Sequence, residues 1–146
     1  MYEKVVVGTD GSPTADRAVQ AAADLARSWE SELHVVTAVR APRPGMASAS
    51  GAPLIDSGAG QVLVAEAAQQ VGERAVEVFG PDLKLVEVHA AVGNADDVIL
   101  NTAAEVGADL IVVGSKGMRG ARRYLGSVPN SVAHGAQCAV LVVKTD

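Results

Sequence analysis

The sequence predicts an α/β fold: a doubly wound, five-stranded parallel sheet in the order 3-2-1-4-5, with helices on both faces. The first observation behind this prediction is that short apolar, β-branched runs alternate with longer segments of helical spacing. The second is that residues 5–8 and 110–113 are uniformly apolar, which is typical of central strands buried on both faces. The third is size, because 146 residues with 49% hydrophobic content suffice for one core. We therefore expect a single domain over residues 1–146.

The first half of the chain is expected to supply two strands and one helix, followed by a long connection. A strand at residues 5–8 leads into a turn, after which Ser12 suits the N-cap and Pro13 the first position of a helix. Residues 33–39 predict the second strand. Residues 41–60, rich in Ala, Gly, Pro and Ser, are longer than most connections, so we expect a loop that is mobile, functional or both. The apolar stripe of the first helix consists of Ala18, Val19, Ala22, Leu25, Ala26 and Trp29.

The second half continues the alternation. Residues 61–79 have helical spacing. Gly80, which can adopt a left-handed conformation, and Pro81, which cannot continue a helix, are expected to end this helix. A strand over residues 83–91 follows, and Asn94 then suits the N-cap of a helix that ends at Gly107. Because each crossover helix must pack on the sheet, this order implies parallel pairing. The remaining expected elements are a strand at residues 110–113, a short helix at residues 128–134 and a last strand, Ala139–Val143.

Residues 114–130 combine closely spaced glycines with cationic side chains directly after the fourth strand. Glycine has no Cβ and can adopt positive φ, so main-chain N–H groups in such a segment can approach an anion. We favour phosphate binding over the alternative, in which the glycines only make tight turns and the arginines are solvated. The glycines are Gly114, Gly117, Gly120 and Gly126, and the cations are Lys116, Arg119, Arg122 and Arg123, in a chain whose net charge is −5.

The expected topology brings this segment together with the turn that follows the first strand. In open α/β sheets, ligands bind outside the carboxyl ends of the strands where the winding direction reverses, here between the first and fourth strands. Both the turn after the first strand and the glycine-rich segment are expected to project into this crevice. From residue chemistry alone, Asp10 either stabilises its turn or contacts a ligand.

Composition excludes several classes of protein. A pI of about 5.1 argues against broad binding of nucleic acid, which needs a basic face. No apolar run approaches the length of a membrane span, and the N-terminus does not resemble a secretory leader, so we expect a cytoplasmic protein. Cys138, the only cysteine, lies within the apolar run of the last predicted strand, and we expect it to be buried and inert.

The residues of common catalytic sites are not arranged for catalysis in this sequence. His34, His89 and His134 are far apart and lack metal-ligand spacing, so we expect no metal held by the protein alone. A Gly-x-Ser-x-Gly elbow and a Walker motif with Gly-Lys-Ser or Gly-Lys-Thr are both absent. Fast ATP hydrolysis is therefore not expected, and at most a slow ATPase remains.

The chain resembles the nucleotide-binding branch of the universal stress protein family along essentially its whole length. The passages that carry the resemblance are residues 5–12, 92–97, 108–115, 125–130 and 138–144. The family's ATP-binding pattern is Gly, two residues, Gly, nine residues, then Gly followed by Ser or Thr. It places Gly114, Gly117, Gly126 and Ser127 in phosphate-binding roles, with eight residues here in the longer gap.

The resemblance implies ATP as the ligand, with Mg²⁺ or Mn²⁺, while some similar proteins bind cyclic AMP instead. Asp10 would contact the nucleoside or the metal that accompanies it, Ala38 would hold the adenine through its backbone, and Ser127 and Val128 would offer amides to phosphate. The full set of expected ligand-binding residues is Thr9, Asp10, Gly11, Ser12, Ala38, Gly114, Ser115, Lys116, Gly117, Met118, Arg119, Gly126, Ser127 and Val128.

Two functional classes lead: a nucleotide-binding sensor of the stress response, and a slow nucleotide hydrolase or transferase built on the same cleft. A stress factor that binds no nucleotide is third. We favour the sensor, because no general base can be identified beside the phosphate segment. The last strand, Ala139–Val143, would leave an unpaired sheet edge in a monomer, and both this edge and the resemblance imply a homodimer.

Overall fold

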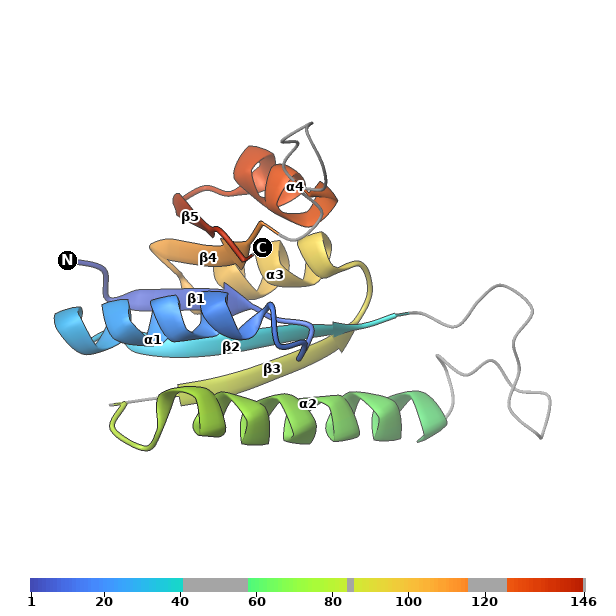
Figure 1. The fold of residues 1–146 in the computed structure, drawn as a ribbon. Helices are drawn as coiled ribbons and strands as arrows, with labels where there is room; N and C mark the ends of the chain where they lie inside the picture. The colour runs from blue at the N-terminus through green and yellow to red at the C-terminus, as the bar shows by residue number, and fades with distance from the viewer. Residues whose placement is uncertain (41–57, 84–85, 116–125, 146) are drawn as a thin grey trace.

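The computed structural model describes residues 1–40, 58–83, 86–115 and 126–145. Five parallel strands form one sheet in the order β3-β2-β1-β4-β5, as the sequence predicts. Figure 1 shows the strands side by side, with helices above and below them. The elements are β1 (Lys4–Gly8), α1 (Asp16–Trp29), β2 (Glu32–Val39), α2 (Gly58–Phe79), β3 (Val86–Val92), α3 (Ala95–Val106), β4 (Leu110–Gly114), α4 (Ser127–Gly135) and β5 (Ala139–Val143).

Strand β1 occupies the centre of the sheet, between β2 and β4. Val5 pairs with Leu33 on one side and with Leu110 on the other, and Val5, Val6 and Val7 are fully buried. The continuous apolar run of β1 is therefore explained as the sequence predicts: helices cover both faces of this strand, so its apolar side chains are all buried.

The helices divide between the two faces of the sheet. Helices α1 and α2 pack over Val5 and Val7, whereas α3 and α4 pack over Val6 and its neighbours (Figure 1). Each face has its own apolar core, and Phe79 at the end of α2 belongs to the first of them. The doubly wound arrangement is thus confirmed.

Several element boundaries differ from the sequence expectations. Helix α1 begins at Asp16 with Ala15 as its N-cap, so Ser12 and Pro13 belong to the preceding turn. The Oγ of Ser12 accepts a hydrogen bond from the N–H of Ala15 at 3.3 Å and so caps that turn rather than the helix. Strand β3 extends over Val86–Val92 rather than residues 83–91, and α4 covers Ser127–Gly135 rather than residues 128–134.

The long connection expected at residues 41–60 is shorter at its end, because α2 already begins at Gly58. Residues 41–57 lie outside the described part of the chain, and so do residues 116–125 of the predicted phosphate segment. In the described ranges, no helix combines the length and hydropathy that a membrane crossing requires.

Helix ends follow local rules in some places and depart from them in others. Gly107 ends α3 with φ 71°, and Gly80 follows α2 with φ 75°, as expected for left-handed caps. Helix α1 instead ends at Glu30 with φ 55°, a conformation uncommon for a residue other than glycine. Asn94 is the N-cap of α3 as predicted, but its side chain makes no capping hydrogen bond.

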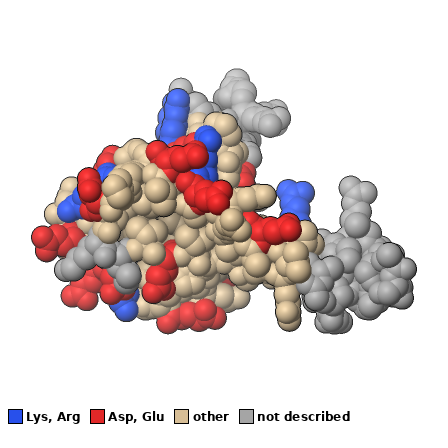
Figure 2. All heavy atoms as spheres, turned by 90° about the horizontal axis from the view of Figure 1, so that it is seen from below, with Lys and Arg blue, Asp and Glu red and all other residues tan. Residues whose placement is uncertain are grey.

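Charged side chains are spread over the surface. On the face shown in Figure 2, acidic side chains occur throughout, and the coloured basic ones do not join into a continuous patch. This distribution agrees with the net charge of −5.

Candidate functional site

A cleft of about 820 Å³ opens where the sheet reverses its winding, outside the carboxyl ends of β1 and β4. This volume lies within the range of small-molecule sites in proteins. The amino ends of α3 and α4 form its other walls. The cleft contains six residues predicted from the sequence, namely Thr9, Asp10, Ala38, Gly114, Ser127 and Val128.

The other predicted residues have different positions. Gly11, together with Asp10 and Ala38, lines a second hollow of about 550 Å³ that faces α2. Gly126 is the N-cap of α4 and is buried beside the cleft lining. Ser12 and Ser115 line neither hollow. The predicted residues Lys116, Gly117, Met118 and Arg119 lie outside the described residues.

The turn after β1 is stabilised by its own side chains. The Oδ1 of Asp10 accepts a hydrogen bond from the N–H of Ser12 at 2.9 Å, and the Oγ1 of Thr9 accepts one from the N–H of Gly11 at 3.0 Å. Gly11 has φ 77°, which explains why glycine suits this position. Asp10 is exposed and lines the cleft, so it both stabilises its turn and lies where a ligand would bind.

Gly114 is required by packing as well as by the cleft. A Cβ at this position would lie 2.7 Å from the Cγ2 of Thr145, closer than real Cβ atoms approach a neighbour. Ser115 next to it is buried: its N–H donates to the carbonyl of Val143 at 2.9 Å, and its Oγ accepts from the N–H of Thr145 at 3.1 Å. Ser115 therefore ties β4 to the end of the chain.

The amino end of α4 offers main-chain donors to the cleft. The first amides of a helix have no carbonyl partner within that helix, and here they belong to Ser127 and Val128, which both line the cleft. Pro129 follows and has no N–H. Two amides, assisted by the partial positive charge of the helix N-terminus, are thus directed to this end of the cleft.

Thr145 adds a hydroxyl that sequence reasoning did not single out. It lines the cleft, is only 3% exposed, and its Oγ1 has no hydrogen-bond partner among the described residues. Buried hydroxyls are usually paired. Thr145 follows the last strand and belongs to no recognisable motif, so the sequence alone gives no indication that it lines the cleft.

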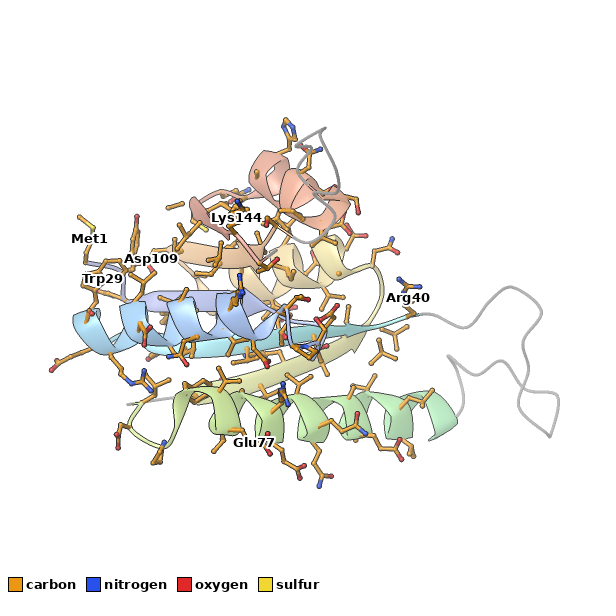
Figure 3. All side chains as sticks on the ribbon, in the orientation of Figure 1. Met1, Trp29, Arg40, Glu77, Asp109 and Lys144 are labelled. Carbon is orange, nitrogen blue, oxygen red and sulfur yellow. The ribbon has the colours of Figure 1, made fainter. Side chains whose placement is uncertain are left out.

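The remaining polar lining comes from the carboxyl end of β2 and the first turn of α3. Arg40 projects from the end of β2 (Figure 3), while Asn94 and Asp96 stand at the start of α3. The sequence predicts Asn94 only as the N-cap of this helix. In the described part of the lining, the carboxylates of Asp10 and Asp96 outnumber the guanidinium of Arg40, so the net charge of this lining does not itself favour an anion.

The hollow beside α2 contains a paired cation. The Nη2 of Arg74 lies 2.6 Å from the Oδ2 of Asp16, and the hydrogen bond and charge of Asp16 raise the pKa of the Arg74 guanidinium. This ion pair joins α2 to the start of α1. Arg74 is therefore already engaged where it lines the hollow.

Two histidines that are 55 positions apart in the sequence are in contact. The Nδ1 of His34 lies 3.0 Å from the Nε2 of His89, because β2 and β3 are neighbours in the sheet. Burial, followed by the adjacent His34, lowers the pKa of His89. Their separation along the sequence is the reason that the sequence did not predict this contact. His134 is exposed near the end of α4.

Cys138 is half-buried rather than fully buried as expected. It precedes β5, and burial followed by the charge of Asp109 raises the pKa of its thiol. A raised pKa keeps the thiol protonated, which agrees with the expected low reactivity.

Comparison with known proteins identifies relatives over the whole chain. The profile described as "Universal stress protein family" matches residues 1–144. The universal stress protein Rv1636 of Mycobacterium tuberculosis is 36% identical, over 99% of this chain and 97% of that protein.

Solved structures of similar proteins contain adenine nucleotides. The crystal structure of a universal stress protein in complex with cAMP has a TM-score of 0.71 and 34% identity, and covers 99% of both chains. The universal stress protein from Archaeoglobus fulgidus in complex with dAMP has a TM-score of 0.60 and 25% identity, and covers 98% of both chains.

Proposed function

The chain belongs to the universal stress protein family, and from this premise we propose that it binds an adenine nucleotide in the cleft between β1, β4 and the amino ends of α3 and α4. The observation that carries the proposal is the convergence of hydrogen-bond donors on one cleft. These are the first amides of α4, which have no carbonyl partner within that helix, and the Oγ1 of Thr145, which is buried without a partner among the described residues. An anionic ligand would satisfy all of them.

In this arrangement a phosphate group binds at the start of α4. The N–H groups of Ser127 and Val128 donate to its oxygens, and the helix dipole favours its negative charge. Ala38 at the end of β2 holds the adenine through its backbone, on the opposite side of the reversal point from Gly114. Lys116 and Arg119 follow β4 and would add the cationic contacts.

ATP, accompanied by Mg²⁺ or Mn²⁺ near Asp10, is the ligand that the glycine pattern of the sequence favours. Cyclic AMP is the second candidate, supported by the relative of 34% identity whose structure contains it. Calorimetric titration with ATP, AMP and cyclic AMP, each with and without Mg²⁺, separates them. One phosphate group is enough to engage the two amides and the one hydroxyl of the cleft. Comparing AMP with ATP therefore tests whether the further phosphates contribute to affinity.

The proposed role is a cytoplasmic sensor in the stress response whose partner contacts depend on bound nucleotide. It is supported by the absence of a Walker lysine and by a described cleft lining without histidine. Phosphate release that scales with protein concentration and disappears with the Ser127→Pro variant would instead establish a slow hydrolase.

Ser127→Pro tests the amide contacts directly. Proline suits the first position of a helix, and Gly126 before it has φ −57° and ψ 161°, a conformation that the residue before proline accepts. The substitution therefore removes one N–H without breaking α4. Since a hydrogen bond to a charged group contributes about 1.5–3 kcal/mol, we expect nucleotide affinity to fall by roughly 10-fold or more.

Ser127→Ala is the matched control, because it removes the hydroxyl and keeps the amide. Its affinity should stay within a few-fold of the original protein. Equal affinities for the Pro variant and the unaltered protein, with unchanged helix content in circular dichroism, would refute phosphate binding at this helix.

A homodimer through β5 completes the proposal. Among the described strands β5 pairs only with β4, so its outer edge is unpaired, and Leu141 is 37% exposed. An open apolar edge of this kind favours pairing with a second copy.

A further inference from the structure

The register of β2 and β3 brings a group of metal-ligating side chains to one face of the sheet. His34 pairs with Glu87, and Val36 pairs with His89, so His34, Glu87 and His89 all project to the face that α3 covers. The group lies at the β3 edge of the sheet. None of its residues lines the nucleotide cleft.

We propose that His34, Glu87 and His89 bind a divalent transition-metal ion, with Zn²⁺ as the best match. Their ligand atoms are the Nδ1 of His34, the Nε2 of His89 and the Oε2 of Glu87. The N–N separation is 3.0 Å, and the carboxylate oxygen lies 3.6 Å from His34 and 3.7 Å from His89.

The distances between these atoms fit such an ion closely. Three points with these separations lie on a circle of about 2.0 Å radius, and Zn–N and Zn–O bonds are about 2.0–2.2 Å long. An ion at or slightly above the centre of this circle would lie within bonding distance of all three atoms. Two imidazoles and one carboxylate are also a common ligand set for zinc.

An unpaired atom on the far side of His34 supports the assignment independently. His34 is 4% exposed, and in the described structure its Nε2 has no hydrogen-bond partner, although the Oε2 of Glu32 lies 3.6 Å away. When Nδ1 binds a metal, Nε2 carries the proton and can donate it to Glu32. Ligating histidines commonly make this contact to a carboxylate, which fixes the ring and strengthens the ligand.

The site is accessible to solvent on one side. The side chain of His89 is 29% exposed and that of Glu87 52% exposed, whereas His34 forms the buried wall. A fourth ligand position can therefore be taken by water. The alternative to metal binding is a simple hydrogen bond between the two imidazoles, from which the titration below distinguishes an ion site.

Titration of the chelator-treated, untagged protein with Zn²⁺ and Co²⁺ tests the proposal. We expect one Zn²⁺ per chain by calorimetry, a higher melting temperature, and a visible absorption of bound Co²⁺ typical of a four-coordinate site. Because nucleotide is left out, the result does not depend on the function proposed above.

The variants His89→Gln and Glu87→Gln change partly exposed side chains, so the fold should survive. Each should lower Zn²⁺ affinity at least 10-fold, and Glu32→Gln should lower it by about 10–100-fold as a partner of a ligand. His134→Gln, an exposed histidine outside the group, is the matched control and should bind as the unaltered protein does. The absence of one-to-one binding, or equal loss in His134→Gln and His89→Gln, would overturn the site.

Discussion

Gly114→Ala should destabilise the protein through a collision with the end of the chain rather than through backbone conformation. Gly114 does not have positive φ, so alanine can adopt its conformation. The new Cβ, however, would lie 2.7 Å from the Cγ2 of Thr145, a buried residue whose main-chain N–H donates a hydrogen bond to the Oγ of Ser115. Overpacking of this kind costs about 1–3 kcal/mol, and because Thr145 stands near the chain end and can shift, we expect about 1–2 kcal/mol.

Urea denaturation and thermal melting measure this loss. A decrease of 1–2 kcal/mol in the free energy of unfolding should lower the melting temperature by roughly 2–8 °C in a chain of this size. The double variant Gly114→Ala/Thr145→Ser lacks the colliding methyl group, and the nearest remaining atoms, Oγ and Cβ, are 3.4 and 3.6 Å away. It should recover most of the lost stability.

Thr145→Val in the Gly114→Ala background is the matched control, because valine keeps the methyl group. It should give no recovery. If Gly114→Ala alone leaves the melting temperature unchanged, or if Ser and Val at position 145 restore it equally, the packing explanation for this glycine is wrong.

Three further predictions concern other parts of the molecule. Asp109→Ala should lower the free energy of unfolding by about 1–2 kcal/mol in urea titrations, because its carboxylate accepts the N–H groups of Glu3 at 2.8 Å and Lys4 at 3.0 Å; an unchanged midpoint would contradict this. Leu141→Lys places a charge at the exposed edge strand β5, so it should shift the protein toward monomer in analytical ultracentrifugation; a dimer that persists in this variant would show that β5 does not form the interface. Alkylation of Cys138 by iodoacetamide should be slow near neutral pH, because the raised pKa of its thiol keeps the thiolate scarce at that pH. The rate should rise only at a pH above the usual pKa of a thiol, and rapid reaction at pH 7 would refute this prediction.

The sheet could be predicted because its strands depend on local composition. Residues 5–8 and 110–113 are apolar throughout, and the structure buries them at the centre, in β1 and β4. Boundaries were less predictable where neighbouring groups compete. Ser12 and Pro13 satisfy the local rule for a helix start, yet the hydrogen bonds of the preceding turn engage Ser12 and delay α1 to Asp16.

The lining of the cleft at the sheet reversal was predictable only in part. Strand ends and a helix start, which are sequence-local features, suffice to place Thr9, Asp10 and Ser127 at this cleft. Thr145 could not, because its place depends on how the chain returns past Gly114 after the last strand. The same holds for His34 and His89, which become neighbours through the pairing register of β2 and β3 and not through any spacing in the sequence.

The two buried side-chain polar atoms without partners in the described residues connect these observations. They are the Nε2 of His34 and the Oγ1 of Thr145. Folded proteins pair nearly all such atoms, since an unpaired one costs about 1–3 kcal/mol. Neither atom is isolated: the Nε2 of His34 lies 3.6 Å from the Oε2 of Glu32, behind a set of metal-ligating atoms, and Thr145 lines the same cleft as the first two residues of α4. Under the two proposals, ligand binding would offset this cost: a metal ion on Nδ1 would hold His34 with its Nε2 proton toward Glu32, and a nucleotide in the cleft would reach the Oγ1 of Thr145.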